Sequence, residues 1–119
     1  MKEENRGLMR SHTCGELRGS DIALNISLCG WVNKYRNLGG LHFVDIRDKY
    51  GITQLSFEKW IEEGGDASIL KELSHETVIA IRGSVGPRPE SAKNKNLDTG
   101  EIEVIVEELN ILSYCDKMG

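Results

Sequence analysis

Residues 31–54 constrain the fold more than any other part of this sequence, because they read as three short strands joined by two tight turns. The first turn, NLGG at 37–40, is rich in residues that tolerate positive φ angles, and the second is DKYG at 48–51. Connections this short allow neighbouring strands to pair only in antiparallel fashion. The segment therefore predicts a β-meander.

The rest of the chain adds two further strands and a helix. Strands are expected at 22–37, 41–47, 52–57, 76–87 and 101–113. Gly30 predicts a bend or bulge in the first of them. Apolar residues at mixed three-to-four spacing predict a helix over 58–74, interrupted at Gly64 and Gly65, with Asp66 or Ser68 as the cap of its second part.

This order of elements predicts an all-β fold with one helix, a five-stranded OB-fold Greek-key barrel with its helix between strands 3 and 4. Such barrels bind oligonucleotides on the face of strands 2 and 3 and in the loops that join strands 1–2 and 4–5. The polar loop at 87–100 would be the loop between strands 4 and 5. We expect one domain at 12–113, preceded by a flexible N-terminal segment at 1–11.

Composition argues against several classes of function. A net charge of −4 disfavours a general basic coat for nucleic acid. The cations instead gather in two segments, and these residues predict a local anion site: Lys34, Arg36, Arg47, Lys49, Arg82, Arg88, Lys93 and Lys95. The chain has neither an apolar run of about 20 residues nor a signal peptide, so we expect a cytoplasmic protein without membrane contact. Its three cysteines lack zinc spacing, so we expect reduced thiols and no metal.

The predicted binding face carries residues suited to single-stranded nucleic acid. Phe43 is interpreted as an exposed platform on which one base stacks, the alternative being a residue at the barrel mouth covered by a loop. The Gln54 amide could pair with a base edge, or could simply be solvated. Lys34 and Arg36 could neutralise phosphate, or could be a solubilising pair. No arrangement of nucleophile and base and no phosphate-cradling loop indicates an enzyme.

Three stretches carry a resemblance to a known family: CGELR at 14–18, LCGWVNKYRNLGGLHFVDIRDKYGITQ at 28–54 and TGEIEV at 99–104. Over nearly the whole chain they resemble the N-terminal anticodon-binding domain of bacterial-type aspartyl-tRNA synthetase, a class II aminoacyl-tRNA synthetase. The asparaginyl and lysyl enzymes share the middle stretch more loosely. The first and last stretches favour the aspartyl enzyme.

The resemblance implies roles for individual residues in holding a tRNA anticodon. Phe43 would stack on the central uridine, Gln54 would read that base, and Arg36 would contact the third base. Glu103 would lie near the first base, with Arg88 and Asn94 or Asn96 in the loop between strands 4 and 5. The chain departs from the family at Lys34, where arginine is common, and at Gly86, where a basic residue is common. Lysine cannot replace an arginine fork in kind.

The resemblance also implies a longer parent protein, an aspartate–tRNA ligase that attaches aspartate to its tRNA with ATP and Mg. Those cofactors and the catalytic residues would lie in a catalytic domain that this chain lacks, and the hinge to it would begin at 114–119. The fragment alone would be inactive, and the parent would dimerise mainly through the absent domain. Three alternatives stay open: the anticodon domain of an asparaginyl- or lysyl-type synthetase, a free-standing OB-fold binder of single-stranded nucleic acid, and a structural or protein-interaction barrel whose basic face pairs with an acidic partner.

Overall fold

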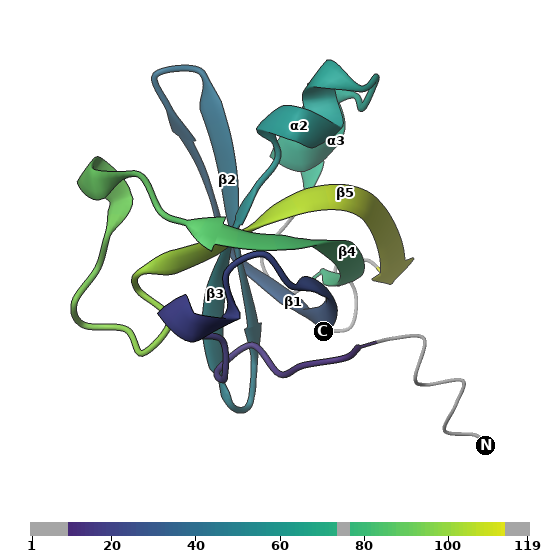
Figure 1. Ribbon diagram of the computed structural model, residues 1–119. Helices are drawn as coiled ribbons and strands as arrows, with labels where there is room; N and C mark the ends of the chain where they lie inside the picture. Colours follow the sequence, from purple (N-terminus) through teal and green to yellow (C-terminus); the bar gives the residue numbers. More distant parts are fainter. Residues whose placement is uncertain (1–9, 74–76, 114–119) are drawn as a thin grey trace.

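The chain forms a closed five-stranded barrel in the computed structural model, which describes residues 10–73 and 77–113 (Figure 1). Its strand order is β1-β2-β3-β5-β4. β3 and β5 pair in parallel, and the other neighbouring strands pair antiparallel. The strands are β1 (Asn25–Leu38), β2 (Leu41–Asp48), β3 (Gly51–Ser56), β4 (Val78–Pro87) and β5 (Ile102–Ser113). The predicted five-stranded OB-fold barrel is confirmed.

The helical segment between β3 and β4 consists of two short helices, α2 (Glu58–Glu62) and α3 (Ala67–Glu72). The chain breaks where the sequence predicted, because Gly64 has φ +109° and a Cβ on Gly65 would collide with the Trp60 ring. Asp66 caps α3, since its carboxylate accepts a hydrogen bond from the Ser68 amide at 2.9 Å. Two 3-10 turns, η1 (Gly19–Asp21) and η2 (Glu90–Ala92), complete the fold.

The first strand differs from its prediction in the residue at which it begins and in the position of its bulge. β1 begins at Asn25, because the preceding chain passes through a positive φ of 86° at Ala23. The register shift in its pairing with β2 lies between Val32 and Lys34 rather than at Gly30. Gly30 instead permits close approach of the strands, since a Cβ there would lie 2.3 Å from the Arg47 carbonyl oxygen.

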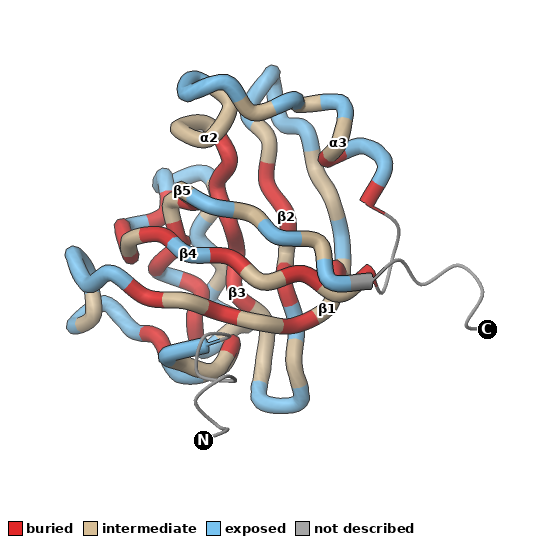
Figure 2. Tube along the Cα trace, turned by 90° about the vertical axis from the view of Figure 1, so that its right-hand side faces the viewer, coloured by how far each residue is buried: buried red, intermediate tan, exposed pale blue. Residues whose placement is uncertain are grey.

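The barrel interior holds the hydrophobic core (Figure 2). Alternating side chains of β2 and β3, together with Phe57 just after β3, are fully buried: Val44, Ile46, Thr53, Leu55 and Phe57. Trp60 of α2 packs edge-on against Phe57, with ring centroids 5.4 Å apart. The helical segment thereby covers one end of the barrel.

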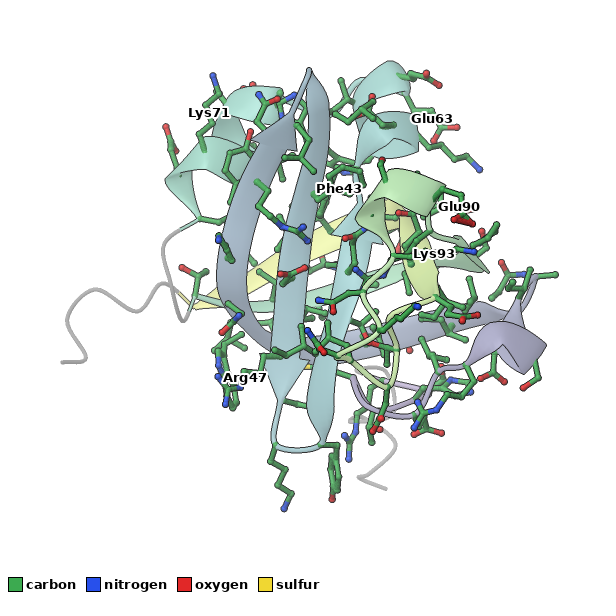
Figure 3. The ribbon with its side chains drawn as sticks, turned by 90° about the vertical axis from the view of Figure 1, so that its left-hand side faces the viewer. Phe43, Arg47, Glu63, Lys71, Glu90 and Lys93 are labelled. Carbon is green, nitrogen blue, oxygen red and sulfur yellow. The ribbon has the colours of Figure 1, made fainter. Side chains whose placement is uncertain are left out.

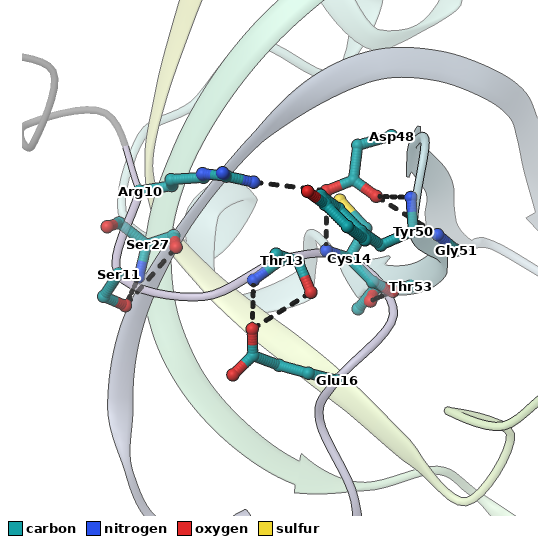
Figure 4. Close-up of polar contacts among 10 residues, drawn as sticks. All are labelled: Arg10, Ser11, Thr13, Cys14, Glu16, Ser27, Asp48, Tyr50, Gly51 and Thr53. Atoms are coloured by element: carbon teal, nitrogen blue, oxygen red, sulfur yellow. Dashed lines mark hydrogen bonds and ion pairs between the residues drawn. The ribbon is translucent and has the colours of Figure 1, made fainter.

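The chain before β1 is fastened to the barrel by polar contacts (Figure 4). The Ser11 amide donates to the Ser27 carbonyl at 2.9 Å, and Arg10 lies 3.8 Å from the Asp48 carboxylate. Asp48 also accepts from the Cys14 amide at 2.8 Å. Residues 10 and 11 of the segment predicted to be flexible therefore contact the barrel, whereas 1–9 and the predicted hinge at 114–119 lie outside the described residues.

Two of the three cysteines are described, and both are free thiols. Cys14 is buried and Cys29 is partly buried, while Cys115 lies outside the described residues. Burial, reinforced by the nearby Asp48 carboxylate, raises the pKa of the Cys14 thiol well above its ordinary range. Within the described residues, no group of side chains is arranged to hold a metal ion. No helix in that part of the chain has both the length and the apolar character of a membrane span.

Candidate nucleic-acid interface

Phe43 lies on the outer face of β2, outside the core cluster (Figure 3). Its register partners are Arg36 on β1 and Ser56 on β3. The Arg36 guanidinium carbon lies 5.9 Å from the centroid of the ring. Only 3% of Phe43 is exposed, so the expectation of an exposed platform is wrong and the alternative of a covered ring describes this structure. A base could reach the ring face only if Arg36 or its surroundings shift.

Gln54 is the buried centre of a polar network rather than a residue on an open face. Its Oε1 accepts hydrogen bonds from Arg36 Nη2 at 3.0 Å and from Arg88 Nη1 at 3.1 Å. Its Nε2 donates to Glu103 Oε1 at 2.9 Å. None of Gln54 is exposed, which corrects its predicted solvent-facing position. The folded chain thus brings five of the seven predicted site residues together: Arg36, Phe43, Gln54, Arg88 and Glu103.

Two features of the barrel assemble this network from distant parts of the sequence. The parallel pairing of β3 with β5 sets Gln54 directly opposite Glu103. Arg88 follows β4 directly, and its Nε donates to the Ile102 carbonyl of β5 at 2.9 Å. Its Nη1 donates to the Ala92 carbonyl of η2 at 3.0 Å. These contacts fix the guanidinium above Gln54.

The charges of the network are balanced, but two of its donors remain open. Arg36 Nη2 donates to Asp45 Oδ1 at 2.6 Å. Arg36 Nε and Arg88 Nη2 are buried and have no hydrogen-bond partner within the described part of the chain. Leaving a buried donor unpaired costs about 1–3 kcal/mol. The site is therefore set to accept a ligand that offers hydrogen-bond acceptors.

Burial also shifts the ionisation of the network. Burial lowers the pKa of the Arg88 guanidinium, although Asp45 and Glu103 oppose that shift. Burial raises the pKa of the Glu103 carboxyl, against the opposing effects of the Gln54 hydrogen bond and of Arg88. Arginine remains charged in proteins, so Arg88 keeps its affinity for acceptors.

Glu103 leads to a prediction about the pH dependence of stability. Its pKa is raised from the ordinary value of 4.5, so the folded state holds the proton more tightly than the unfolded state does. The free energy of unfolding should therefore fall as pH rises through the interval between the two pKa values. Glu103→Gln removes this titration, so the stability of the variant minus that of the unmodified protein should increase as pH rises above the ordinary glutamate pKa of 4.5.

Urea denaturation of both proteins at a series of pH values measures the effect. Glu101→Gln is the matched control, because Glu101 is an exposed carboxylate just before β5. A stability difference between Glu103→Gln and the unmodified protein that does not change with pH would contradict the prediction.

The other two predicted site residues lie outside the network. Lys34 is exposed, and its register partner across the pair of strands is Asp45. Asn94 stabilises a turn of the loop after β4, because its Oδ1 accepts from the Asn96 amide at 2.9 Å and its own amide donates to the Gly100 carbonyl at 3.1 Å. Asn94 also borders a hollow of about 620 Å³ together with Arg18, Lys93 and Lys95. Both residues border the candidate site, and their contact with nucleic acid stays a prediction.

Comparison with protein families adds an independent finding. Residues 26–112 match the model of the tRNA anti-codon family, which is described as an OB-fold nucleic acid binding domain. That match covers most of the barrel, from β1 to the end of β5.

Similar proteins of known name are tRNA ligases. The chain is 45% identical over 111 residues to the aspartate–tRNA(Asp/Asn) ligase of Thermotoga maritima, covering 93% of this chain and 19% of that protein. It is 50% identical over 109 residues to the aspartate–tRNA ligase of Phocaeicola vulgatus, covering 89% and 18%. The chain thus spans less than a fifth of the length of these relatives.

Solved structures show the same barrel. Asparaginyl-tRNA synthetase from Pyrococcus horikoshii superposes with a TM-score of 0.69 at 27% identity, over 87% of this chain and 23% of that one. The aspartyl tRNA synthetase of Entamoeba histolytica gives a TM-score of 0.72 over 92% of this chain and 22% of that one. At 15% identity, the second likeness concerns the fold alone.

Proposed function

This chain belongs to the tRNA anti-codon family of OB-fold nucleic acid binding domains, and from this premise we propose that it is the anticodon-binding module of an aspartate–tRNA ligase. The full-length protein would attach aspartate to its tRNA. ATP and Mg would act in a catalytic domain outside this chain, through which the parent would also dimerise. Similarity to aspartate–tRNA ligases over 93% and 89% of the chain supports this assignment.

The observation that carries the proposal is the pair of open guanidinium donors beside an aromatic ring. Arg36 Nε and Arg88 Nη2 await acceptors, and Phe43 lies beneath the Arg36 guanidinium. Uracil presents carbonyl oxygens, whereas adenine and cytosine present an amino donor on the corresponding edge. An unpaired uridine in an anticodon loop therefore fits the donors of this site better than adenosine does.

Gln54 would support this recognition indirectly, through its hydrogen bonds to the two arginines. Both of its hydrogen bonds through Oε1 already go to Arg36 and Arg88, and the side chain is fully buried. In this arrangement it holds the two guanidinium groups in place. A direct contact between Gln54 and a base would require one arginine to leave Oε1, and the exchange of that bond for contacts with RNA would couple binding to a local rearrangement.

The test is a binding titration with an anticodon stem-loop of about 17 nucleotides, in which unpaired loop bases are available for readout. The domain should bind the loop GUC more tightly than the same loop with its central U changed to A. Equal binding would contradict the proposal and favour a general binder of single strands. If the domain shows no salt-sensitive binding to either RNA, the alternative of a protein-binding barrel is favoured.

A matched pair of substitutions locates the contact on the protein. Phe43→Leu keeps an apolar side chain but removes the aromatic face, so it should weaken binding of the GUC loop by about 1 kcal/mol. Phe57→Leu makes the same change inside the barrel, where Phe57 is fully buried, and should leave the affinity of the folded protein unchanged. Equal effects of the two substitutions on affinity would show that Phe43 has no particular contact with RNA.

A further inference from the structure

A second hollow lies on the same side of the barrel as the polar network. It measures about 330 Å³ and is formed by the turn between β2 and β3, the loop at 96–99 and the turn at Gly15. Its walls include Arg47, Lys49, Tyr50 and Asn96. The sequence placed Arg47 and Lys49 in a basic segment that predicts a local anion site. It gave Tyr50 no role, because the loop that forms one wall of the hollow is distant in sequence.

Strand register places this hollow next to the network. Arg47 pairs with Ile52, which also lines the hollow, while Asp45 pairs with Gln54. Residues two apart on a strand share a face and are separated by about 7 Å. The hollow therefore continues the face that carries the network, within reach of the next nucleotide of a bound strand.

The side chains around the hollow suit a nucleotide. Tyr50 is 56% exposed, and Lys49 Nζ lies 5.4 Å from its ring centroid. Arg47 is exposed, and its Nη1 donates a hydrogen bond of 3.5 Å to Asn33 Oδ1 on β1. A second cation also borders the ring, since the Arg10 guanidinium carbon lies 5.9 Å from its centroid. An exposed aromatic ring beside cations is the combination by which proteins hold single-stranded nucleic acid.

The Asp48 carboxylate holds the turn that carries Tyr50 in place (Figure 4). Asp48 Oδ1 accepts from the amides of Tyr50 at 2.8 Å and Gly51 at 3.1 Å, and Arg10 lies 3.8 Å from the same carboxylate. These contacts satisfy the Asp48 carboxylate, and the other acidic residue of the lining, Asp98, lies 3.8 Å from Arg18 Nη2. The Gly15 backbone packs against the turn so closely that a Cβ there would lie 2.1 Å from the Tyr50 carbonyl oxygen. The backbone at Tyr50 is therefore fixed by these contacts.

We propose that this hollow receives a second nucleotide of the same RNA strand, next to the one that the network would hold. Its base packs against the Tyr50 ring, and its phosphate contacts Lys49 and Arg47. The inference rests on the proposed function, because it extends the path of the anticodon loop across the barrel. It adds Tyr50, Lys49 and Arg47 to the binding surface.

The test uses the GUC stem-loop and paired substitutions. Tyr50→Ala should weaken binding about 5-fold or more, whereas Tyr50→Phe, which keeps the ring, should bind like the unmodified domain. Lys49→Ala should reduce the slope of log affinity against log salt concentration by about 0.7, the contribution of one phosphate contact on a single strand. Lys71→Ala is the matched control, because Lys71 is an exposed lysine on α3, and it should leave the slope unchanged (Figure 3).

The outcomes separate this inference from the proposed function. If Phe43→Leu weakens binding while Tyr50→Ala and Lys49→Ala change neither affinity nor salt slope, the second nucleotide site is overturned and the anticodon function stands. If the unmodified domain binds no RNA, both are overturned. An effect of Lys71→Ala equal to that of Lys49→Ala would show a general charge effect, and it would overturn the assigned phosphate contact.

Discussion

Replacing Gln54 by leucine is expected to lower the free energy of unfolding by about 3 kcal/mol and to abolish preference for the GUC stem-loop. Leucine fills a similar volume but removes the acceptor shared by Arg36 and Arg88 and the donor to Glu103. Glu103 would then keep a buried carboxylate without its hydrogen bond. Removing one partner from a buried ionic network costs more than the network contributes, because the remaining groups cannot regain water.

Urea denaturation and the stem-loop titration measure the two effects of Gln54→Leu separately. Asn110→Leu is the control, because it makes a similar polar-to-apolar change at an exposed position of β5. It should change stability by less than about 0.5 kcal/mol. A Gln54→Leu protein as stable as the control would mean that the network contributes nothing to the fold, and the positioning role assigned to Gln54 would be withdrawn.

Gly83→Ala should destabilise the barrel by about 3 kcal/mol, at the upper end of the usual cost of overpacking. A Cβ on Gly83 would lie 2.1 Å from the Ile105 carbonyl oxygen and 3.0 Å from the Val106 Cα. Both are backbone atoms of β5, so the clash is relieved only by separating β4 from β5. The pairing is already irregular here, with a register shift between Arg82 and Gly83.

Gly19→Ala provides the control for Gly83→Ala, because nothing lies within 4 Å of a Cβ placed there. Thermal or urea unfolding measures the stability of both variants. Each substitution lowers the conformational entropy of the unfolded chain in the same way, so the difference between them reports the steric clash. Equal stabilities would contradict the close packing of β4 against β5. Since β4 leads into Arg88 and β5 carries Glu103, Gly83→Ala should also weaken RNA binding.

The elements of the fold were predictable because local signals agree along the chain. Two short turns of glycine and polar residues, alternating apolar residues on β2 and the Gly64–Gly65 break with Asp66 as cap all appear where the sequence indicated them. The strand ends moved by a few residues, since the backbone conformation at Ala23 depends on its contact with β4.

For the candidate site, the sequence identified residues of the binding face but not how far they are buried. The resemblance pointed to Arg36, Phe43, Gln54, Arg88 and Glu103 as residues of the binding face. It could not show that Phe43 and Gln54 are covered on that face. The side chain of Asn94 stabilises a turn, because its Oδ1 accepts a hydrogen bond from the Asn96 amide, and its contact with RNA stays a prediction.

By itself, then, the sequence determined the barrel, the order of its elements and the residue types on the binding face, because these follow from periodicity and turn chemistry within short windows. Only the tertiary structure decided what covers that face. The burial of Gln54 depends on Arg88 from the loop after β4 and on Glu103 across the parallel pairing of β3 with β5. These partners are far apart along the chain, and they meet only because closing the barrel brings β5 beside β3. The two open donors and the hollow beside Tyr50 exist for the same reason.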